Sequence, residues 1–254
     1  MVSLEHYLIT GLPIPLGDGL GTIYQPTIKE ILSNKMTVDD FLQPFLIRVD
    51  LLNNTEIFEG FAQKINDFDL LFLQESDGNF LFTNGGYSIL GRLIECLKLL
   101  YNTKSVELSF GEQVIKIDNK YIIDRNNFTY LADIILEVFD TEKPKPKDDK
   151  PKYKDKARQM LWEKLERRRA EEAQKKALTM ADIINIVVHI DNYIDYSKVV
   201  EMTYFQLLNT YKTFMNKMSY DEYLMFKSSG QFDLKQDQKH WTTENKVKKS
   251  TIQI

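Results

Sequence analysis

Residues that build disulfides and metal centres are scarce in this sequence. Cys96 is the only cysteine, which excludes an intrachain disulfide and a cysteine-rich zinc site. The three histidines, His6, His189 and His240, lie far apart, so we expect neither a histidine-rich metal centre nor a cofactor. Catalytic motifs are missing as well, since the chain has no His-Glu-x-x-His, no P-loop and no Ser, His, Asp arrangement. We therefore expect a protein that is not an enzyme.

Long apolar runs are also missing. No stretch of about 18 consecutive apolar residues indicates a membrane span. Residues 1–6 lack the basic segment and apolar run of a secretory signal. We expect a soluble protein in the cytoplasm. The hydrophobic fraction of 43% is too high for a wholly disordered chain, so a buried core is expected.

The glycine-dense segment 12–24 superficially resembles a phosphate loop. Thr22 stands where a dinucleotide fingerprint needs its third glycine, and no Gly-Lys-Ser/Thr follows. We interpret the segment as turn-rich, with glycines that supply positive φ angles.

Charge is distributed unevenly along the chain. Residues 1–142 carry 10 basic and 21 acidic side chains, residues 143–176 carry 14 and 7, and residues 177–254 carry 9 of each. Such asymmetry bears on association more than on fold. We divide the chain into an acidic domain (1–142), a basic linker (143–177), a helical domain (178–241) and a disordered tail (242–254). We expect the two domains to pack separately, and the sequence does not settle whether they dock.

The acidic domain combines helical and alternating apolar patterns. Helices are predicted at 26–32 with Pro26 at the first helical position, at 37–52 with a kink or break at Pro44, at 87–100 and at 128–139. Alternation at 106–110, 115–117 and 121–123 predicts a small antiparallel meander. Cys96 falls on the apolar face of the third helix, where we expect it to act as a small buried hydrophobe. The predicted class is α+β, with a mixed α/β domain first.

The helical domain is predicted to be a small all-α unit of about three helices. They cover 179–188, 203–215 and a short segment at 219–226. Tyr204, Tyr211 and Phe214 recur on one aromatic-rich face of the second helix. The total core is small, so the unit is expected to need support from a neighbour.

The linker has two parts of different composition. Residues 143–152 alternate proline with charge and predict an exposed, semi-rigid spacer. Residues 155–177 are strong helix formers. Nucleic-acid binding is one interpretation, in which Arg167, Arg168 and Arg169 neutralise phosphates and Trp162 stacks on a base. The interleaved acids favour the other interpretation, a solvated helix with i,i+4 ion pairs.

Several segments of the chain resemble phage proteins of Gram-positive hosts. These segments are 178–184, 202–211, 229–230 and 239–241, with 7–11 and 21–31 near the N-terminus. In such proteins a Thr-x-x-Gln-Leu helix follows a basic linker, and a late His-Trp pair closes the domain. Asn209 departs from the pattern, because an acid is common at that position.

Proteins of this kind are described as tail assembly chaperones or as uncharacterised tail-region proteins. The resemblance implies a partner, the tape-measure or tail-tube protein, and no catalysis. An acidic body with an aromatic-rich helical unit is compatible with holding an apolar helix. The candidate partner-binding side chains are Tyr204, Tyr211, Phe214, Trp162, Arg167, Arg168, Arg169 and Trp241. Core packing is the stronger competing interpretation for Tyr204, Tyr211 and Phe214.

Two other functions stay open at this point. The protein could be a structural component of the virion tail or baseplate, which places it in the particle instead of the host cytoplasm. Nucleic-acid binding through the basic linker is the third and least favoured. The sequence also leaves a homo-oligomer open.

Overall fold

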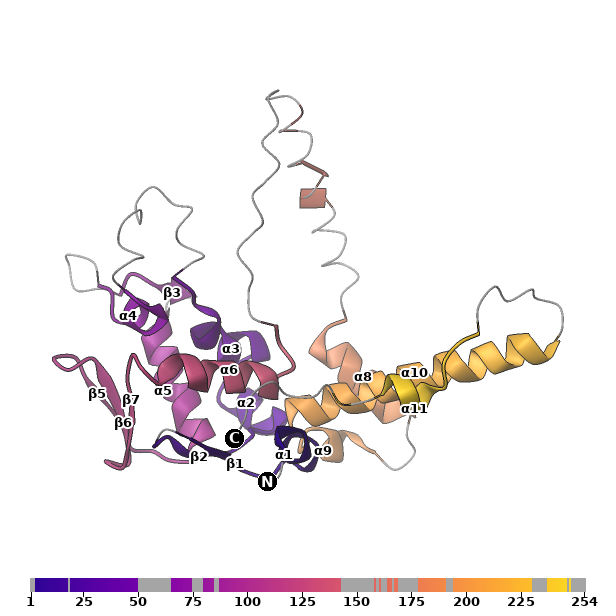
Figure 1. Cartoon of the computed structure of the whole chain (residues 1–254), viewed down its shortest axis with the longest axis horizontal. Coiled ribbons are helices and arrows are strands. Elements are labelled where there is room, and N and C mark those ends of the chain that lie inside the picture. Colours follow the sequence, from indigo (N-terminus) through magenta and orange to yellow (C-terminus); the bar gives the residue numbers. More distant parts are fainter. Residues whose placement is uncertain are drawn as a thin grey trace.

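The computed structural model describes most of the two predicted domains. The described residues are 3–17, 19–49, 65–74, 80–84, 87–142, 178–190, 194–229 and 237–245, with 158, 160, 164, 165, 167, 168 and 247. The linker prediction (143–177) and the end of the predicted tail therefore lie largely outside them. Figure 1 shows a body of helices and short sheets from which one long helix extends. The chain is α+β, as the sequence predicted.

The N-terminal segment forms a helix and a hairpin. Helix α1 (Leu4–Thr10) ends at Gly11, which has a left-handed φ of 70°. Strands β1 (Ile14–Leu16) and β2 (Gly21–Ile23) pair antiparallel, with Ile14 opposite Ile23. Both isoleucines are fully buried. The glycine-dense segment therefore contains a hairpin where only turns were predicted.

Two capped helices follow the hairpin. Helix α2 (Ile28–Ser33) begins with a capping box of Thr27 and Glu30, and α3 (Val38–Leu46) begins with one of Thr37 and Asp40. Each box satisfies backbone N–H groups that the first helical turn leaves free. Hydrogen bonds from the Thr37 backbone and hydroxyl hold the pKa of Asp40 below its ordinary value.

The predicted end of the second capped helix at residue 52 is wrong. Helix α3 ends at Leu46, and Pro44 lies inside it without breaking it. Asp67 explains the earlier end, because its carboxylate accepts hydrogen bonds from the Val49 backbone N–H (2.8 Å) and from Arg48 (2.7 Å). Arg48 also pairs with Asp133 at 3.3 Å. These contacts turn the chain and tie α3 to α4 (Asp67–Leu71) and α6 (Phe128–Val138).

The main core lies between α3, α5 (Ile89–Leu100) and α6. Strands β3 (Thr83–Asn84) and β4 (Tyr87–Ser88) form a short antiparallel pair that leads into α5. Along α5 the apolar face predicted from the sequence is buried, with Leu93, Cys96, Leu97 and Leu100 at 0% exposure. Aromatic rings join the helices, since Phe41 stacks on Phe139 with centroids 5.0 Å apart.

The predicted meander is present as a three-stranded antiparallel sheet. Its order is β5 (Val106–Ser109), β6 (Val114–Ile117), β7 (Tyr121–Ile123). Val106 lies opposite Ile117, and Ile115 lies opposite Ile123. The three isoleucines at 115, 117 and 123 are fully buried, which places one face of the sheet on the main core.

The C-terminal part is helical. It contains α8 (Met180–Ile190), α9 (Tyr196–Val199), α10 (Tyr204–Ser229) and α11 (Trp241–Glu244). The prediction of two helices at 203–215 and 219–226 is wrong, because α10 runs through both without interruption. Residues 216–219 hold neither glycine nor proline to end it. Helix α11 covers three positions that were assigned to the disordered tail. Among the described residues no helix is both long and apolar enough to cross a membrane.

Two glycines of the first hairpin allow a matched test of its packing. Gly21 has a φ of 76°, and a Cβ there would lie 2.3 Å from Tyr121 Cζ. Gly19 has a φ of 73°, but a Cβ there would meet nothing within 4 Å. We predict that Gly19→Ala costs about 1 kcal/mol in the free energy of unfolding from backbone strain. Gly21→Ala adds overpacking and is expected to cost about 2–5 kcal/mol in total. Equal losses in urea unfolding would contradict the close approach of Tyr121.

Candidate partner-binding surface

The metal-ligating side chains of the described residues are dispersed over the fold. No group of three or more His, Cys, Asp or Glu side chains there is placed to hold a metal ion. Cys96 is buried, its thiol donates a hydrogen bond to the Phe41 carbonyl at 3.4 Å, and burial raises its pKa. A thiol with a raised pKa is a poor nucleophile, so Cys96 has the packing role that its position in the sequence indicated.

The segment just before α10 is fixed to the N-terminal domain by backbone contacts. Thr27 and Thr203 form an isolated antiparallel bridge. The backbone N–H groups of Ile28 and Lys29 donate to the carbonyls of Met202 (3.0 Å) and Val200 (2.8 Å). The sequence led us to expect two domains that pack separately. These contacts show that the two domains pack against each other. We call this contact region the joint.

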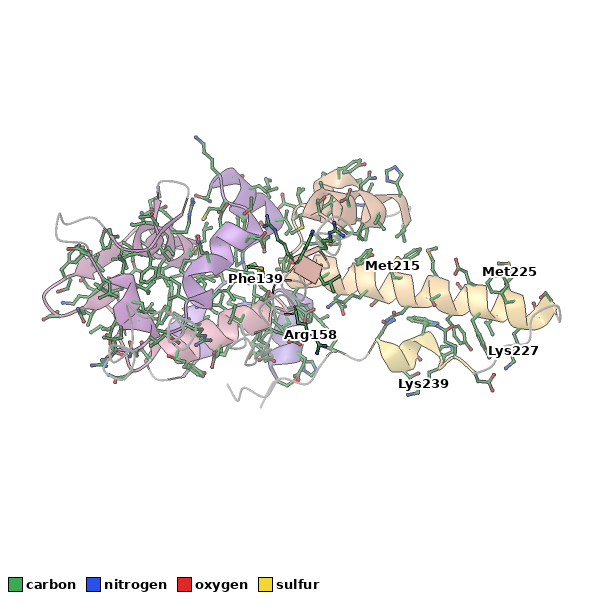
Figure 2. The ribbon with its side chains drawn as sticks, turned by 90° about the horizontal axis from the view of Figure 1, so that it is seen from above. Phe139, Arg158, Met215, Met225, Lys227 and Lys239 are labelled. Atoms are coloured by element: carbon green, nitrogen blue, oxygen red, sulfur yellow. The ribbon has the colours of Figure 1, made fainter. Side chains whose placement is uncertain are left out.

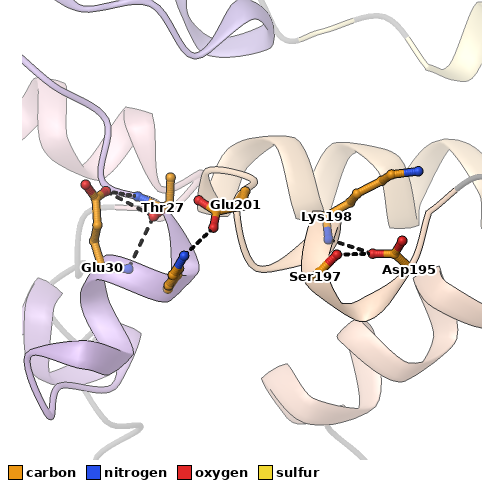
Figure 3. A network of polar contacts seen from close by, with 7 residues as sticks. Thr27, Glu30, Asp195, Ser197, Lys198 and Glu201 are labelled. Carbon is orange, nitrogen blue, oxygen red and sulfur yellow. Dashed lines mark hydrogen bonds and ion pairs between the residues drawn. The ribbon is translucent and has the colours of Figure 1, made fainter.

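Polar side chains reinforce the joint. Lys29 and Glu201 form an ion pair at 2.6 Å beside the capping box of α2, and Figure 3 shows both contacts. The Gln206 amide donates to the Ile9 carbonyl at 2.8 Å, which attaches α10 to the end of α1. Because the Lys29 and Glu201 side chains are more than half exposed, the ion pair contributes little stability beside the backbone bonds.

An apolar cluster fills the joint. Ile28 of α2 packs with Val187 of α8, Val199 of α9 and Leu207 of α10, and each is at most 1% exposed. Without Ile28 the helical domain would have only three fully buried side chains in this cluster. The N-terminal domain thus supplies the support that the small helical core was expected to need.

Tyr204 links this cluster to the main core. Its ring stacks on Phe139 with centroids 5.5 Å apart, and it packs against residues of both clusters. Lys212, two helical turns further along α10, forms an ion pair with Asp140. The inner half of α10 (204–214) therefore contacts both apolar clusters and the end of α6.

The outer half of α10 extends beyond this support. We call residues 215–229 the arm, and Figure 1 shows it reaching away from the body of the protein. A helix of 15 residues is roughly 22 Å long at 1.5 Å per residue. An isolated helix of that length is marginal in water, so the arm needs contacts of its own.

Segment 237–245, which includes α11, covers one side of the arm. Asp237 accepts hydrogen bonds from the Tyr223 hydroxyl (2.6 Å) and the Lys227 ammonium (2.7 Å). These bonds and the Lys227 charge hold the pKa of Asp237 below its ordinary value. The rings of Tyr220 and His240 meet edge to face at 4.8 Å. Figure 2 shows Lys227 and Lys239 on this side of the helix.

The other side of the arm carries exposed methionines. Met215, Met218 and Met225 are 40%, 41% and 63% exposed, and we call these three residues the methionine stripe. At 3.6 residues per turn they fall within an arc of roughly 80° around the helix. Figure 2 shows Met215 and Met225 along the edge of α10 opposite Lys227. Exposed apolar side chains aligned on one face are typical of a contact surface.

The methionine stripe continues the face by which the inner half of α10 packs. Tyr204, Leu207 and Tyr211 occupy the same arc of the helix, in which Leu207 is fully buried. One apolar face thus runs the length of α10, covered by protein at the joint and exposed on the arm. Methionine is flexible and polarizable, so such a face adapts to different partner side chains.

The predicted partner-binding residues are divided between several places. Tyr204 and Tyr211 are half-buried in the joint, whereas Phe214 is half-buried just before the arm. Trp241 is half-buried on α11 beside His240, with ring centroids 5.8 Å apart. The described linker residues Arg167 and Arg168 are helical and exposed. Trp162 and Arg169 lie outside the described residues.

Sequence reasoning missed the methionine stripe. The signal was present, because positions 204, 211, 218 and 225 repeat every seven residues and carry Tyr, Tyr, Met and Met. The predicted gap between the helices at 203–215 and 219–226 hid this seven-residue repeat.

Tyr204 provides a test of the joint at high pH. Burial, followed by the nearby charges of Asp39 and Asp140, raises the pKa of its hydroxyl. In the unfolded chain the hydroxyl ionises near its ordinary pKa of about 10. Its contribution to the free energy of unfolding is therefore complete below that pH, and it is lost as pH rises through the higher pKa of the folded chain. We predict that Tyr204→Phe loses less unfolding free energy than the wild type between pH 8 and pH 11. Exposed Tyr24 gives the control, because Tyr24→Phe is expected to follow the wild type. Identical pH profiles for all three proteins would contradict burial of Tyr204 in the joint.

Comparison with known protein families gives a match in the C-terminal part. A family model described as the YomV second domain matches residues 172–246, which include α8 to α11. The family is of phage origin. No curated protein and no solved structure matches the chain significantly. The match covers less than half of the 254 residues and contains the joint-facing part of α10, the arm and its covering segment. The chain therefore carries a phage-related domain.

Proposed function

We propose that the protein is a non-catalytic tail assembly chaperone of a phage, which holds an apolar helix of the tape-measure or another tail protein. The methionine stripe on the projecting arm carries the proposal. A helix that adds to a second helix does so through apolar anchors at i, i+3, i+4 and i+7, and the arm presents such a face. The phage-related domain provides the context, since it contains the arm.

The small size of the surface suits a transient role. Three methionines on about four helical turns offer far less than the 1,200–2,000 Å² that stable interfaces bury in total. A contact of this size releases its partner readily, as assembly requires. Because methionine side chains are flexible, the stripe can bind apolar helices of different sequence without selecting strongly among them. We place this activity in the host cytoplasm, before the tail is complete.

Co-expression with the tape-measure protein of the same phage tests the proposal. The wild type is expected to raise the soluble fraction of the tape measure several-fold. Met218→Glu with Met225→Glu should abolish the effect, because two charges on the stripe cannot be desolvated against an apolar helix. Leu224→Glu is the matched control: Leu224 is 44% exposed on the opposite side of the arm, so its variant should act as the wild type.

Each alternative outcome has a definite meaning. No gain in solubility with the wild type would contradict the chaperone role. A gain that survives both methionine substitutions would contradict the methionine stripe as the site. Stoichiometric protein in purified particles would favour a structural component of the tail or baseplate.

A further inference from the structure

A carboxylate lies within the methionine stripe. Glu222 is exposed, and at 3.6 residues per turn it falls between Met218 and Met215 around the helix. Along the helix axis it lies between Met218 and Met225. A partner that covers the stripe therefore covers Glu222 as well.

This carboxylate has no counter-charge of its own. On a helix, the side chains that reach a given residue lie three or four positions away. For Glu222 these neighbours are uncharged, namely Met218, Ser219, Met225 and Phe226. Within the part of the chain that the structure describes, no hydrogen bond or ion pair joins Glu222 to another residue.

The two lysines of the arm do not neutralise this face. Lys227 pairs with Asp237 at 2.7 Å, on the side of the arm that segment 237–245 covers. Lys217 falls roughly 140° away from Glu222 around the helix, four positions before Asp221, which is the spacing that favours an ion pair. The apolar face of the arm therefore carries an uncompensated negative charge near its centre.

This charge restricts what can cover the methionine stripe. A helix laid on the methionines displaces water from Glu222, and removing an ionised carboxylate from water without a counter-charge is costly. A lysine or arginine on the covering helix offsets that cost. The same ion pair also fixes the register of the two helices, as polar groups in coiled-coil seams do.

A second arm is a poor occupant of the stripe. Two arms paired along the whole stripe would bring their Glu222 carboxylates close together, and like charges facing each other across a contact are strongly unfavourable. The same repulsion acts against any helix whose apolar face carries an acid. The charge of the stripe therefore favours a partner of a different sequence.

We propose that the methionine stripe binds amphipathic helices whose apolar face contains a lysine or arginine, which pairs with Glu222. The methionines supply an adaptable apolar surface, and Glu222 supplies the selectivity that they lack. Phe226, which is 42% exposed, lies about one turn beyond Glu222 and extends the same face. The inference rests on the proposed function, because it names the kind of client helix that this face holds.

Fluorescence anisotropy with two synthetic helical peptides tests the proposal. The peptides share one amphipathic sequence and differ only at the centre of the apolar face, where one carries lysine and the other glutamate. The full-length wild type is expected to bind the lysine peptide about tenfold more tightly, because Glu222 attracts the lysine and repels the glutamate. Raising the ionic strength from about 0.05 M to about 0.5 M should reduce this ratio by screening the charges.

Three variants of the arm locate the source of the preference. Glu222→Lys should reverse it, so that the glutamate peptide binds more tightly. Glu222→Gln should bind the two peptides with nearly equal affinity. Lys217→Glu, which changes a charge on the opposite side of the helix, is the matched control and should keep the preference of the wild type.

The outcomes separate this inference from the proposed function. Equal affinities of the wild type for the two peptides, no binding of either peptide, or a lysine preference that survives Glu222→Lys would overturn the inference. Self-association of the wild type that Met218→Glu abolishes would overturn it in favour of a second copy. Absence of the preference in a protein that keeps the tape measure soluble refutes the inference alone. A lysine preference in a protein that does not keep the tape measure soluble refutes the chaperone role alone.

Discussion

The structure depends on how the first turns of α10 are attached to the N-terminal domain. Ile28 completes the apolar cluster around Leu207, and the backbone of residues 27–29 bonds the chain just before α10. Burial of such side chains is worth about 1.5–3 kcal/mol each, which exceeds what the exposed ion pair of Lys29 adds. With its inner half fixed in this way, α10 has a defined direction, and its outer half becomes an arm. The function we propose requires that arm.

The two sides of the arm differ in physical character. On one side, tyrosines and Lys227 form hydrogen bonds, an ion pair and ring contacts with segment 237–245. On the other, three methionines and Glu222 face solvent. The covered side gives a marginal helix the support it needs, and the exposed side stays available for association.

Elements stabilised by nearby residues were predictable from the sequence. Thr37 and Asp40 indicated the start of α3, the apolar spacing of α5 indicated its buried face, and alternation indicated the meander. Each depends on residues within a few positions of one another, where periodicity and capping rules apply. The α+β class followed from their order.

Features set by distant residues could not be predicted. Helix α3 ends where it does because of Asp67, about twenty positions away, and the joint pairs Thr27 with Thr203. The same limit explains the candidate site. Tyr204, Leu207 and the methionines share one helical face, but only the folded chain distinguishes the covered part from the exposed part. Ser219 followed by Glu222 resembles a helix start, and it is in fact the middle of α10.

The most direct test of the account is the reactivity of a thiol placed in the methionine stripe. The native Cys96 is buried and is expected to react slowly with a maleimide. A thiol introduced by Met218→Cys can therefore be labelled selectively in the otherwise native chain at high dilution. We predict labelling at the rate of a fully accessible thiol, slowed about tenfold or more by the tape-measure protein. Lys217→Cys, on the far side of the arm, should keep its rate. Slow labelling of the dilute free chain, or equal rates at both positions when the tape measure is added, would contradict an exposed, partner-binding face on α10.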